Sequence, residues 1–280
     1  MKPFFSIVIP TLNEEKFLPN LLSDLQKQTA MNFEVIITDG HSEDKTKLRA
    51  FEYKDNLPLT FLEHIRSNVS IQRNLGAKKG NGHYLIFLDA DSRVASSFTK
   101  KLEMNIKKYK GLFFVPTLRT DDPNTETQFV LDVINSFFEL SQNLGRPFAM
   151  GGGMVFEKKY FLTIGGFDQK LDFGEDYEIA LRSYQWGVRA KYLKEVSVIY
   201  SLRRIRREGK LKSYYKIFIS TMLYLIKGKT ERKLFDYELG GHLYEKSRAI
   251  SKTPKSHFDL IIKRAKKAFN NLLKEEPLTN

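Results

Sequence analysis

The chain has no cysteine, which excludes disulfide bridges and thiolate-bound metals. It also has no apolar run of about 18 residues, so we expect no membrane-spanning helix. No amino-terminal signal peptide is visible, because Met1-Lys2-Pro3 leads directly into a short apolar stretch that ends at Ile9. Neither a GxGxxG nor a P-loop pattern follows that stretch, which argues against a dinucleotide-binding fold and a P-loop phosphotransferase. These absences lead us to expect a cytoplasmic protein.

Basic residues are concentrated in the last part of the chain. The whole sequence carries 46 Lys and Arg against 33 Asp and Glu, a formal net charge of +13. Residues 201–280 hold 20 of the basic and 8 of the acidic residues, so the first 200 residues are almost neutral. A tail of this kind suits a polyanion such as an anionic membrane surface, nucleic acid or a phosphorylated acceptor.

Short apolar runs alternate with helical patterns over the first 91 residues. Residues 17–25 carry apolar side chains at helical spacing, and 71–79 are also predicted to be helical. Four segments are predicted strands: residues 4–9, 33–38, 59–62 and 84–88. This alternation predicts an α/β fold, in which a mostly parallel sheet is flanked by helices.

Two aspartates follow the most apolar of these strands. Asp89 and Asp91 lie at the carboxyl end of the strand, where ligands bind in open parallel sheets, and their charges need compensation there. A hard divalent cation, Mg²⁺ or Mn²⁺, would compensate them and bring a diphosphate with it. The alternative is an Asp-rich start of the next helix, with Asp91 or Ser92 as its N-cap. Other polar residues follow neighbouring strands and are expected on the same edge, namely Thr11, Glu14 and Asp39.

The middle of the chain is predicted to mix strands, helices and glycine turns. Further strands are expected at 112–116, at Tyr192 and at 196–200, with helices at 96–110 and 128–143 and a polar loop over 117–127. The wide apolar face of residues 128–143 is expected to belong to the core. Gly151–Gly153 predict a bend or a close backbone approach. Glu175-Asp176 open another helix, where acids are also favoured simply by the helix dipole.

Five groups of segments together resemble one known family. FSIVIPTLNEE, VIITDGHSED, IQRNLGAKKGNGHYLIFLDADSRV, GGGMVF with IGGFD, and GEDYEIALRSYQWG look like the inverting glycosyltransferases of family 2, which have the GT-A fold. The resemblance runs from about Phe4 to Tyr200 in the family's order and spacing. We therefore expect a GT-A, Rossmann-like domain over residues 1–205, followed by a basic, mainly helical region over 206–280.

The resemblance implies roles for residues at the carboxyl edge of the sheet. Asp176, paired with Glu175, would be the catalytic base that deprotonates the acceptor hydroxyl, and Asp91 would ligate Mg²⁺ or Mn²⁺ at the diphosphate. The donor would be a UDP- or GDP-linked sugar, and a single displacement would invert its anomeric centre. The residues implied for the nucleotide-sugar pocket are Pro10, Thr11, Glu14, Asp39, Arg73, Asp89 and Ala90.

Processive members of this family carry a Gln-x-x-Arg-Trp pattern after the acidic pair. No such pattern can be drawn around Trp186, which is preceded by Gln185. Transfer of a single sugar is therefore the favoured interpretation.

The basic tail begins with Arg203 and Arg204, directly after the last predicted strand. They are expected either to fold over the donor and contact its diphosphate or to form a solvated linker. Residues 214–229 suit a helix lying in a membrane interface or one packed on the domain, and 257–273 have a basic amphipathic pattern. A tail at the membrane surface suggests a cell-envelope or lipid-linked glycan acceptor, with peripheral contact at the inner face of the plasma membrane.

Two other functions stay open from the sequence. A polyprenyl-phosphate acceptor would make the protein resemble the dolichol-phosphate mannosyltransferases. A nucleic-acid-binding protein would explain the basic tail, but it would leave the four aspartates of the predicted site without a role, so we expect no nucleic-acid partner. The sequence specifies neither the donor, the acceptor nor the oligomeric state.

Overall fold

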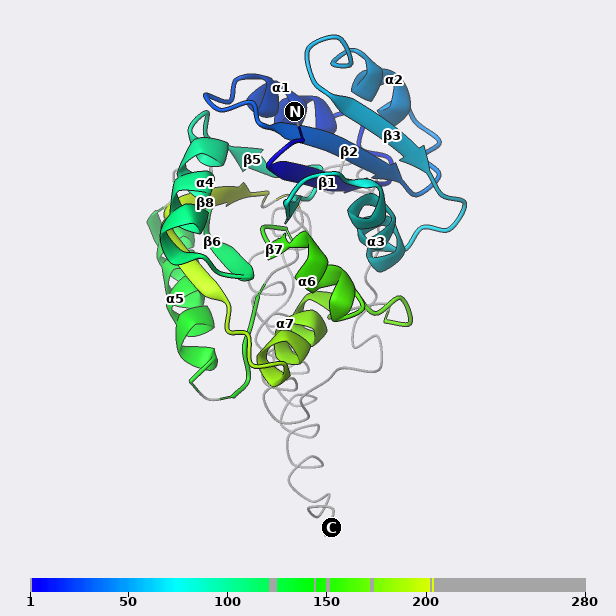
Figure 1. Ribbon diagram of the computed structural model, residues 1–280. Helices are drawn as coiled ribbons and strands as arrows, with labels where there is room; N and C mark the ends of the chain where they lie inside the picture. The colour runs from blue at the N-terminus through cyan, green and yellow to red at the C-terminus, as the bar shows by residue number, and fades with distance from the viewer. Residues whose placement is uncertain are drawn as a thin grey trace, which may run out of the picture. The chain divides into compact units, whose positions relative to one another are not determined.

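The structure, a computed structural model, describes residues 2–120, 125–143, 145–149, 152–171, 174–201 and 203. The strands of this described part form one sheet in the order β3-β2-β1-β4-β7-β6-β8-β5 (Figure 1). Their bounds are β1 Phe5–Thr11, β2 Phe33–Asp39, β3 Leu59–Glu63, β4 Tyr84–Phe87, β5 Arg93–Val94, β6 Phe113–Thr120, β7 Val155–Glu157 and β8 Lys191–Tyr200.

The first half of the sheet is parallel, as the alternation of strands and helices predicts. β1 pairs with β2 on one side and with β4 on the other, and β2 pairs with β3. One expected boundary is wrong, because β1 continues through Pro10 to Thr11. Pro10 has no amide hydrogen to donate. The pairing of β1 with β4 ends at Val8, so no hydrogen bond to β4 is lost at Pro10. Proline is tolerated in a strand at such a position.

The second half of the sheet is mixed. β7 runs antiparallel to both neighbours, β4 and β6, while β6 and β8 are parallel. The loop expected over 117–127 is partly wrong, because residues 117–120 belong to β6 and pair with Ser197–Tyr200. The two short strands expected near the end form the single strand β8, and the register between it and β6 shifts between Pro116 and Thr117.

Helices cover both faces of the sheet (Figure 1). One apolar cluster unites side chains of α1, α2 and α4 with one face of the sheet, and a second unites α3, α6 and α7 with the other. Neighbouring residues of β1 divide between these clusters, Ile7 and Ile9 facing one and Val8 the other, as the period of a strand requires. The helices are α1 Leu18–Gln26, α2 Thr46–Phe51, α3 Val69–Lys79, α4 Phe98–Tyr109, α5 Thr125–Ser141, α6 Lys158–Thr163 and α7 Glu175–Gln185.

Helix α5 departs from the expectation that its apolar face belongs to the core. Leu131 and Phe138 are buried, but Phe129 is 68% exposed, and Val133 and Leu140 are also exposed. Within the described residues, no helix is both long and apolar enough to cross a membrane. The predicted tail segments 214–229 and 257–273 lie outside the described residues, so the boundary at 205/206 stays a prediction.

Helix α3 lies directly against β1, and this contact fixes the helix that carries Arg73. A methyl group at Gly76 would collide with Val8 Cγ1. At the turn after the helix, a methyl group at Gly82 would collide with the backbone of Ser6. The absence of side chains at these glycines lets helix and strand approach closely, with α3 beginning at the carboxyl edge of the sheet.

Candidate active site

The carboxyl ends of β1 and β2 are joined by side-chain hydrogen bonds to Asp39. The Thr11 hydroxyl donates to Asp39 Oδ1 over 2.7 Å, and the Ser42 amide donates to Oδ2 over 2.7 Å. The Ser42 hydroxyl donates to Oδ1 over 2.6 Å. Helix α2 begins only at Thr46, so Ser42 does not cap it and instead holds Asp39 in place. Thr11 and Asp39 therefore lie together at this edge, as the strand ends predict.

Gln72 on α3 strengthens the same edge. Its amide nitrogen donates to the backbone oxygens of Thr11 and Thr38, over 2.8 and 2.7 Å. Gln72 is buried and thereby ties the helix to the last residues of two strands. We did not single out this residue from the sequence, although it stands next to Arg73 in the IQRN segment.

Arg73 connects three elements of the fold. Its Nη2 atom lies 2.8 Å from Asp89 Oδ1 at the end of β4, and its Nη1 atom lies 2.9 Å from Glu175 Oε1 at the start of α7. The Arg73 side chain is only 4% exposed, whereas its partners Asp89 and Glu175 are 28% and 12% exposed, so the guanidinium itself is shielded from water. Its guanidinium carbon also lies 5.3 Å from the centre of the Phe167 ring.

Three nearby carboxylates raise the pKa of Arg73. Burial by itself lowers the pKa of this guanidinium, but the negative charges of Asp89, Glu175 and Asp176 outweigh burial and raise the pKa above its ordinary value. Asn74, the next residue, donates to the Phe167 carbonyl and accepts from the Phe167 amide, over 2.8 and 2.9 Å. These contacts hold the turn at 165–168 against α3.

A second ion-pair network contains Glu14, Asp91 and Arg203. The two terminal nitrogens of Arg203 each donate to one oxygen of Glu14 over 2.7 Å. Arg203 Nε lies 2.8 Å from Asp91 Oδ2, and the guanidinium carbon is 4.7 Å from the centre of the Phe17 ring. One guanidinium thus joins two carboxylates that come from different strand ends.

Both carboxyl groups of this network have raised pKa values. Burial raises the pKa of Glu14 to about 7, although the hydrogen bonds and charge of Arg203 act in the opposite direction. Burial also raises the pKa of Asp91, against the effect of Arg203, while the neighbouring charge of Asp89 adds to the rise. Burial therefore affects these two pKa values more than the ion pairs with Arg203 do. The network holds two carboxyl groups but only one positive charge.

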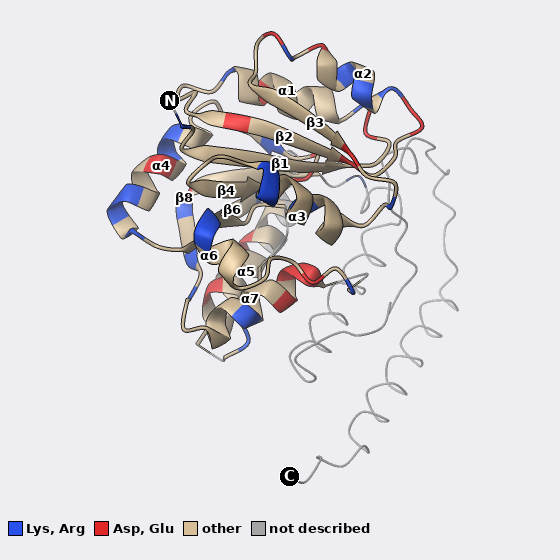
Figure 2. Cartoon of the chain, turned by 45° about the vertical axis from the view of Figure 1, so that its right-hand side comes forward, with Lys and Arg blue, Asp and Glu red and all other residues tan. Residues whose placement is uncertain are grey.

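Helix α7 brings the predicted catalytic pair to this region. Gly174 precedes the helix with a φ of 82°, a left-handed conformation that suits glycine. Glu175 binds Arg73, whereas Asp176 Oδ1 accepts a hydrogen bond from the Tyr177 amide over 2.9 Å. Figure 2 shows the first turn of α7 in the colour of acidic residues, in contrast to the lysines along α4.

The remaining predicted residues divide into three cases. Pro10 pairs in register with Thr38 at the same strand ends. The Ala90 side chain is buried in the apolar cluster beneath α1 and α4, so a contact of this residue with a ligand would come from its backbone. Arg204 lies outside the described residues.

The carboxylates at this edge fit a hard divalent cation. A positive group, the Arg203 guanidinium, lies between Glu14 and Asp91, so these oxygens are already arranged around a cation. A methyl group on Gly152 would collide with Asp89 Oδ2, so the glycine leaves room for that oxygen. Among the described residues, no group of three or more His, Cys, Asp or Glu forms a complete protein cage. Mg²⁺ commonly binds one or two carboxylates together with substrate phosphates, and this donor set is of that kind.

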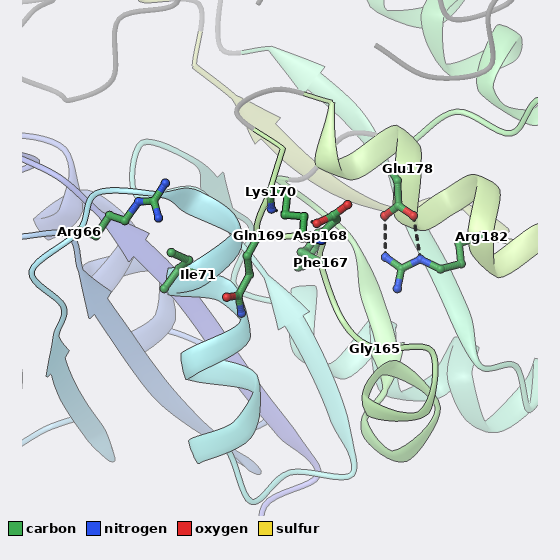
Figure 3. A pocket seen from close by; sticks show the side chains of 9 residues that line it. All are labelled: Arg66, Ile71, Gly165, Phe167, Asp168, Gln169, Lys170, Glu178 and Arg182. Atoms are coloured by element: carbon green, nitrogen blue, oxygen red, sulfur yellow. Dashed lines mark hydrogen bonds and ion pairs between the residues drawn. The ribbon is translucent and has the colours of Figure 1, made fainter. Parts of the chain in front are cut away.

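A pocket of about 660 Å³ lies beside α7 and the first turn of α3 (Figure 3). Glu178 and Arg182, one turn apart on α7, form an ion pair on one side of it, with a shortest distance of 2.6 Å. Arg66 lies on the opposite side in Figure 3, and Lys170 lies between them. Phe167 lines the pocket and also contacts Arg73, so it separates this hollow from the buried ion pairs.

Comparison with known proteins identifies the family of the chain. The family described as Glycosyl transferase family 2 matches residues 6–165. An uncharacterized glycosyltransferase of Haemophilus influenzae is 28% identical over 184 residues, which cover 64% of this chain and 62% of that protein. The poly(ribitol-phosphate) β-N-acetylglucosaminyltransferase TarS of Staphylococcus aureus is 33% identical over 94 residues, 32% of this chain and 16% of that protein. The chain therefore matches less than two thirds of the length of these relatives.

Solved structures share the fold at low sequence identity. TarS residues 1–349 in complex with UDP-GlcNAc give a TM-score of 0.59 at 20% identity, covering 72% of this chain and 58% of that one. A mannosyltransferase from Pyrobaculum calidifontis in complex with GDP-Man and Mn²⁺ gives a TM-score of 0.60 at 16% identity, covering 81% and 70%. The predicted GT-A fold is thus confirmed, and with more than half of its length matched by the family, the chain belongs to glycosyltransferase family 2.

Proposed function

We propose that the protein transfers one sugar from a nucleoside-diphosphate sugar to an acceptor hydroxyl, with inversion at the anomeric carbon. We further propose that it acts in the synthesis of a cell-envelope or lipid-linked glycan. Membership of family 2 supports the reaction class. The similarity to TarS, named for a glycosylated poly(ribitol phosphate), supports the acceptor class. The donor is proposed to be UDP- or GDP-linked, because similar structures contain one or the other.

The observation that carries this proposal is the bridge formed by Arg73. By binding both Asp89 and Glu175, it connects the end of the central strand to the helix that begins with Glu175-Asp176. The proposed donor edge and the proposed catalytic base are therefore held by a single buried residue. A network of this kind positions a base relative to a donor, which is the geometric requirement for in-line displacement.

In the proposed reaction, Asp176 accepts the proton of the acceptor hydroxyl while that oxygen attacks the anomeric carbon. The bond to the diphosphate breaks on the opposite face, and the nucleoside diphosphate leaves with its electron pair. Glu175 stays paired with Arg73 and orients the first turn of α7. Thr11, Glu14 and Asp39 line the proposed nucleoside side, and Arg203 and Arg204 are proposed to contact the diphosphate.

Asp91, with Asp89 nearby, would hold a Mg²⁺ or Mn²⁺ ion. When bound, the ion supplies Lewis-acid stabilisation of the charge that develops on the leaving diphosphate. The acidic residues of the described edge do not suit a nucleic-acid backbone, so we do not propose a nucleic-acid partner.

The proposal is tested with a panel of UDP- and GDP-sugars, with and without Mn²⁺, by measuring donor binding and donor hydrolysis. We expect wild-type protein to bind and slowly hydrolyse one of them. Asp176→Asn should retain binding but lower hydrolysis by about 10²- to 10⁴-fold, the usual contribution of a general base. NMR of the released sugar should show the inverted anomer as first product.

Glu178→Gln is the matched control, because it removes a carboxylate two residues further along α7 that pairs with Arg182. This variant should retain most of the hydrolysis. Equal losses in the two variants would point to damage to α7 rather than loss of a base. If wild-type protein bound no nucleotide sugar under any condition, the proposed function would be wrong.

A further inference from the structure

All three guanidinium nitrogens of Arg203 contact carboxylates of the acidic site. Two nitrogens bind the two oxygens of Glu14, the third lies 2.8 Å from Asp91 Oδ2, and one face covers Phe17. The side chain of Arg203 is 18% exposed, compared with 8% for Glu14 and 13% for Asp91. The arginine therefore covers the two carboxylates from the solvent side.

The same atoms of Asp91 are required by a metal ion. The carboxylate already accepts from Arg203 and Ser201, and Arg203 takes Oδ2. A Mg²⁺ ion sits about 2.0–2.1 Å from its oxygen ligands, so an ion on Oδ2 would lie close to the guanidinium that contacts the same oxygen. Two adjacent cations in a site partly shielded from water repel each other. Arg203 and the metal therefore compete for Asp91.

We propose that Arg203 is an internal counter-cation that is exchanged for the divalent metal and the donor. In the donor-free protein it pairs with Glu14 and Asp91 and covers the site. When the metal binds Asp91, the guanidinium leaves that carboxylate and turns its two terminal nitrogens from Glu14 to the diphosphate, to which they donate two parallel hydrogen bonds. This inference rests on the proposed function, because it requires a metal at Asp91.

The exchange predicts how metal and donor influence each other. Metal alone must displace Arg203 without offering it a new partner, so its binding is weakened. Metal and donor together supply that partner, because the diphosphate accepts the released guanidinium. The two ligands should therefore bind with positive coupling, and by linkage the coupling is the same in both directions. Without Arg203, most of this coupling should disappear.

The test is calorimetric titration of Mn²⁺ into the metal-free, donor-free full-length protein. Arg203→Ala should bind Mn²⁺ alone about tenfold more tightly than wild type, within the usual range of such couplings. With Mn²⁺ saturating, the same variant should bind the donor more weakly. Its midpoint of thermal unfolding should be lower than wild type without metal and should rise more on addition of Mn²⁺.

Two further variants keep the test decisive. Arg203→Lys retains the charge but not the two-pronged geometry, so its Mn²⁺ affinity should fall between those of wild type and Arg203→Ala. Arg93→Ala is the matched control, because Arg93 forms a similar two-pronged pair with Asp24, over 2.6 and 2.7 Å, at an exposed position. It should leave Mn²⁺ affinity unchanged.

Unchanged or weaker Mn²⁺ binding by Arg203→Ala would overturn the inference, as would the absence of Mn²⁺ binding in that variant. Such a result leaves the proposed transferase function intact if wild-type protein still binds a nucleotide sugar. The test therefore distinguishes a failure of the proposed Arg203 exchange from a failure of the proposed transferase function.

Discussion

The two buried arginine networks of the site differ in how the chain holds them. Arg73 belongs to α3, which packs closely on β1, and its side chain is 4% exposed. Arg203 follows the end of β8 and is 18% exposed. Each binds two carboxylates, but Arg73 connects three elements of the fold, whereas Arg203 covers two strand ends from outside. The comparison indicates that one arginine is part of the framework and the other is an exchangeable occupant.

The largest expected effect is the loss of Arg73. Arg73→Ala removes the buried partner of Asp89 and Glu175, whose side chains are 28% and 12% exposed, and breaking a largely buried pair from one side destabilises a protein by up to about 3–5 kcal/mol. Urea unfolding at neutral pH measures the change, with failure to fold as its extreme form. Arg93→Ala, at an exposed pair, should lose only about 0–1 kcal/mol. A similarly small loss of stability for Arg73→Ala would contradict the conclusion that Arg73 belongs to the framework whereas Arg203 is exchangeable.

The protonation of Glu14 gives the next largest effect and belongs to the exchangeable network. Because the folded-state pKa of Glu14 is about 7, above the ordinary 4.5, the folded protein binds a proton more tightly than the unfolded chain. This stabilisation is fully present below pH 4.5 and is lost as the pH rises through about 7. Its full size is on the order of 3 kcal/mol. Unfolding free energies of metal-free wild type and Glu14→Gln, measured from pH 4.5 to 8, should diverge over that range.

The contribution of Arg203 to this titration can be measured separately. Removing a neighbouring positive charge raises the pKa of a carboxyl group further. In Arg203→Ala the range of declining stability should therefore move to higher pH. A shift to lower pH would contradict the ion pair seen between the two residues.

Gly152 tests how firmly the Arg73 network fixes Asp89. Gly152→Ala places a methyl group against Asp89 Oδ2, and Arg73 holds the other oxygen of that carboxylate. Overpacking of this kind costs about 1–3 kcal/mol. Donor binding in the presence of Mn²⁺ should weaken, while binding of Mn²⁺ alone should change less. Unaltered donor binding would mean that a shift of the Asp89 side chain does not affect the donor site.

The smallest expected effect concerns Phe17, on which Arg203 lies. A cation over an aromatic ring contributes about 0.5–2 kcal/mol, depending on exposure. Phe17→Leu removes this contact and keeps an apolar residue at the start of α1. Without this contact, Arg203 is bound less firmly at the two carboxylates. Mn²⁺ alone should therefore bind a few-fold more tightly than to wild type, as measured by calorimetry. Tighter Mn²⁺ binding by Phe17→Leu than by Arg203→Ala would contradict the inference that Phe17 acts through Arg203.

The sequence predicts the positions of the strand ends better than the contacts between them. Thr11, Asp39 and Asp89 could be placed on one edge because parallel strands end on the same side of a sheet. The pairing of Arg73 with Glu175 spans 102 residues, and that of Arg203 with Glu14 spans 189. No local pattern carries such information, and the roles assigned to these residues stay predictions until they are measured.

One feature that the sequence left open and one wrong expectation have identifiable physical causes. The direction of β7 could not be predicted, because three buried residues look the same in parallel and antiparallel strands. The apolar face of α5 is visible in the sequence, but periodicity says only which side of a helix is apolar and not what covers it. Phe129 and Leu140 are consequently exposed in the described structure despite their spacing.

The long span between Glu14 and Arg203 also has a consequence for synthesis on the ribosome. Glu14 and Asp91 emerge from the exit tunnel well before their arginine partner at residue 203 has been added. A nascent chain that has completed β1 and β4 therefore carries these two acids without the guanidinium that later joins them. Shortened versions that end at Tyr200 retain every strand of the described sheet yet lack this arginine. Such fragments should depend more strongly on added divalent cations for a stable fold than the full chain does.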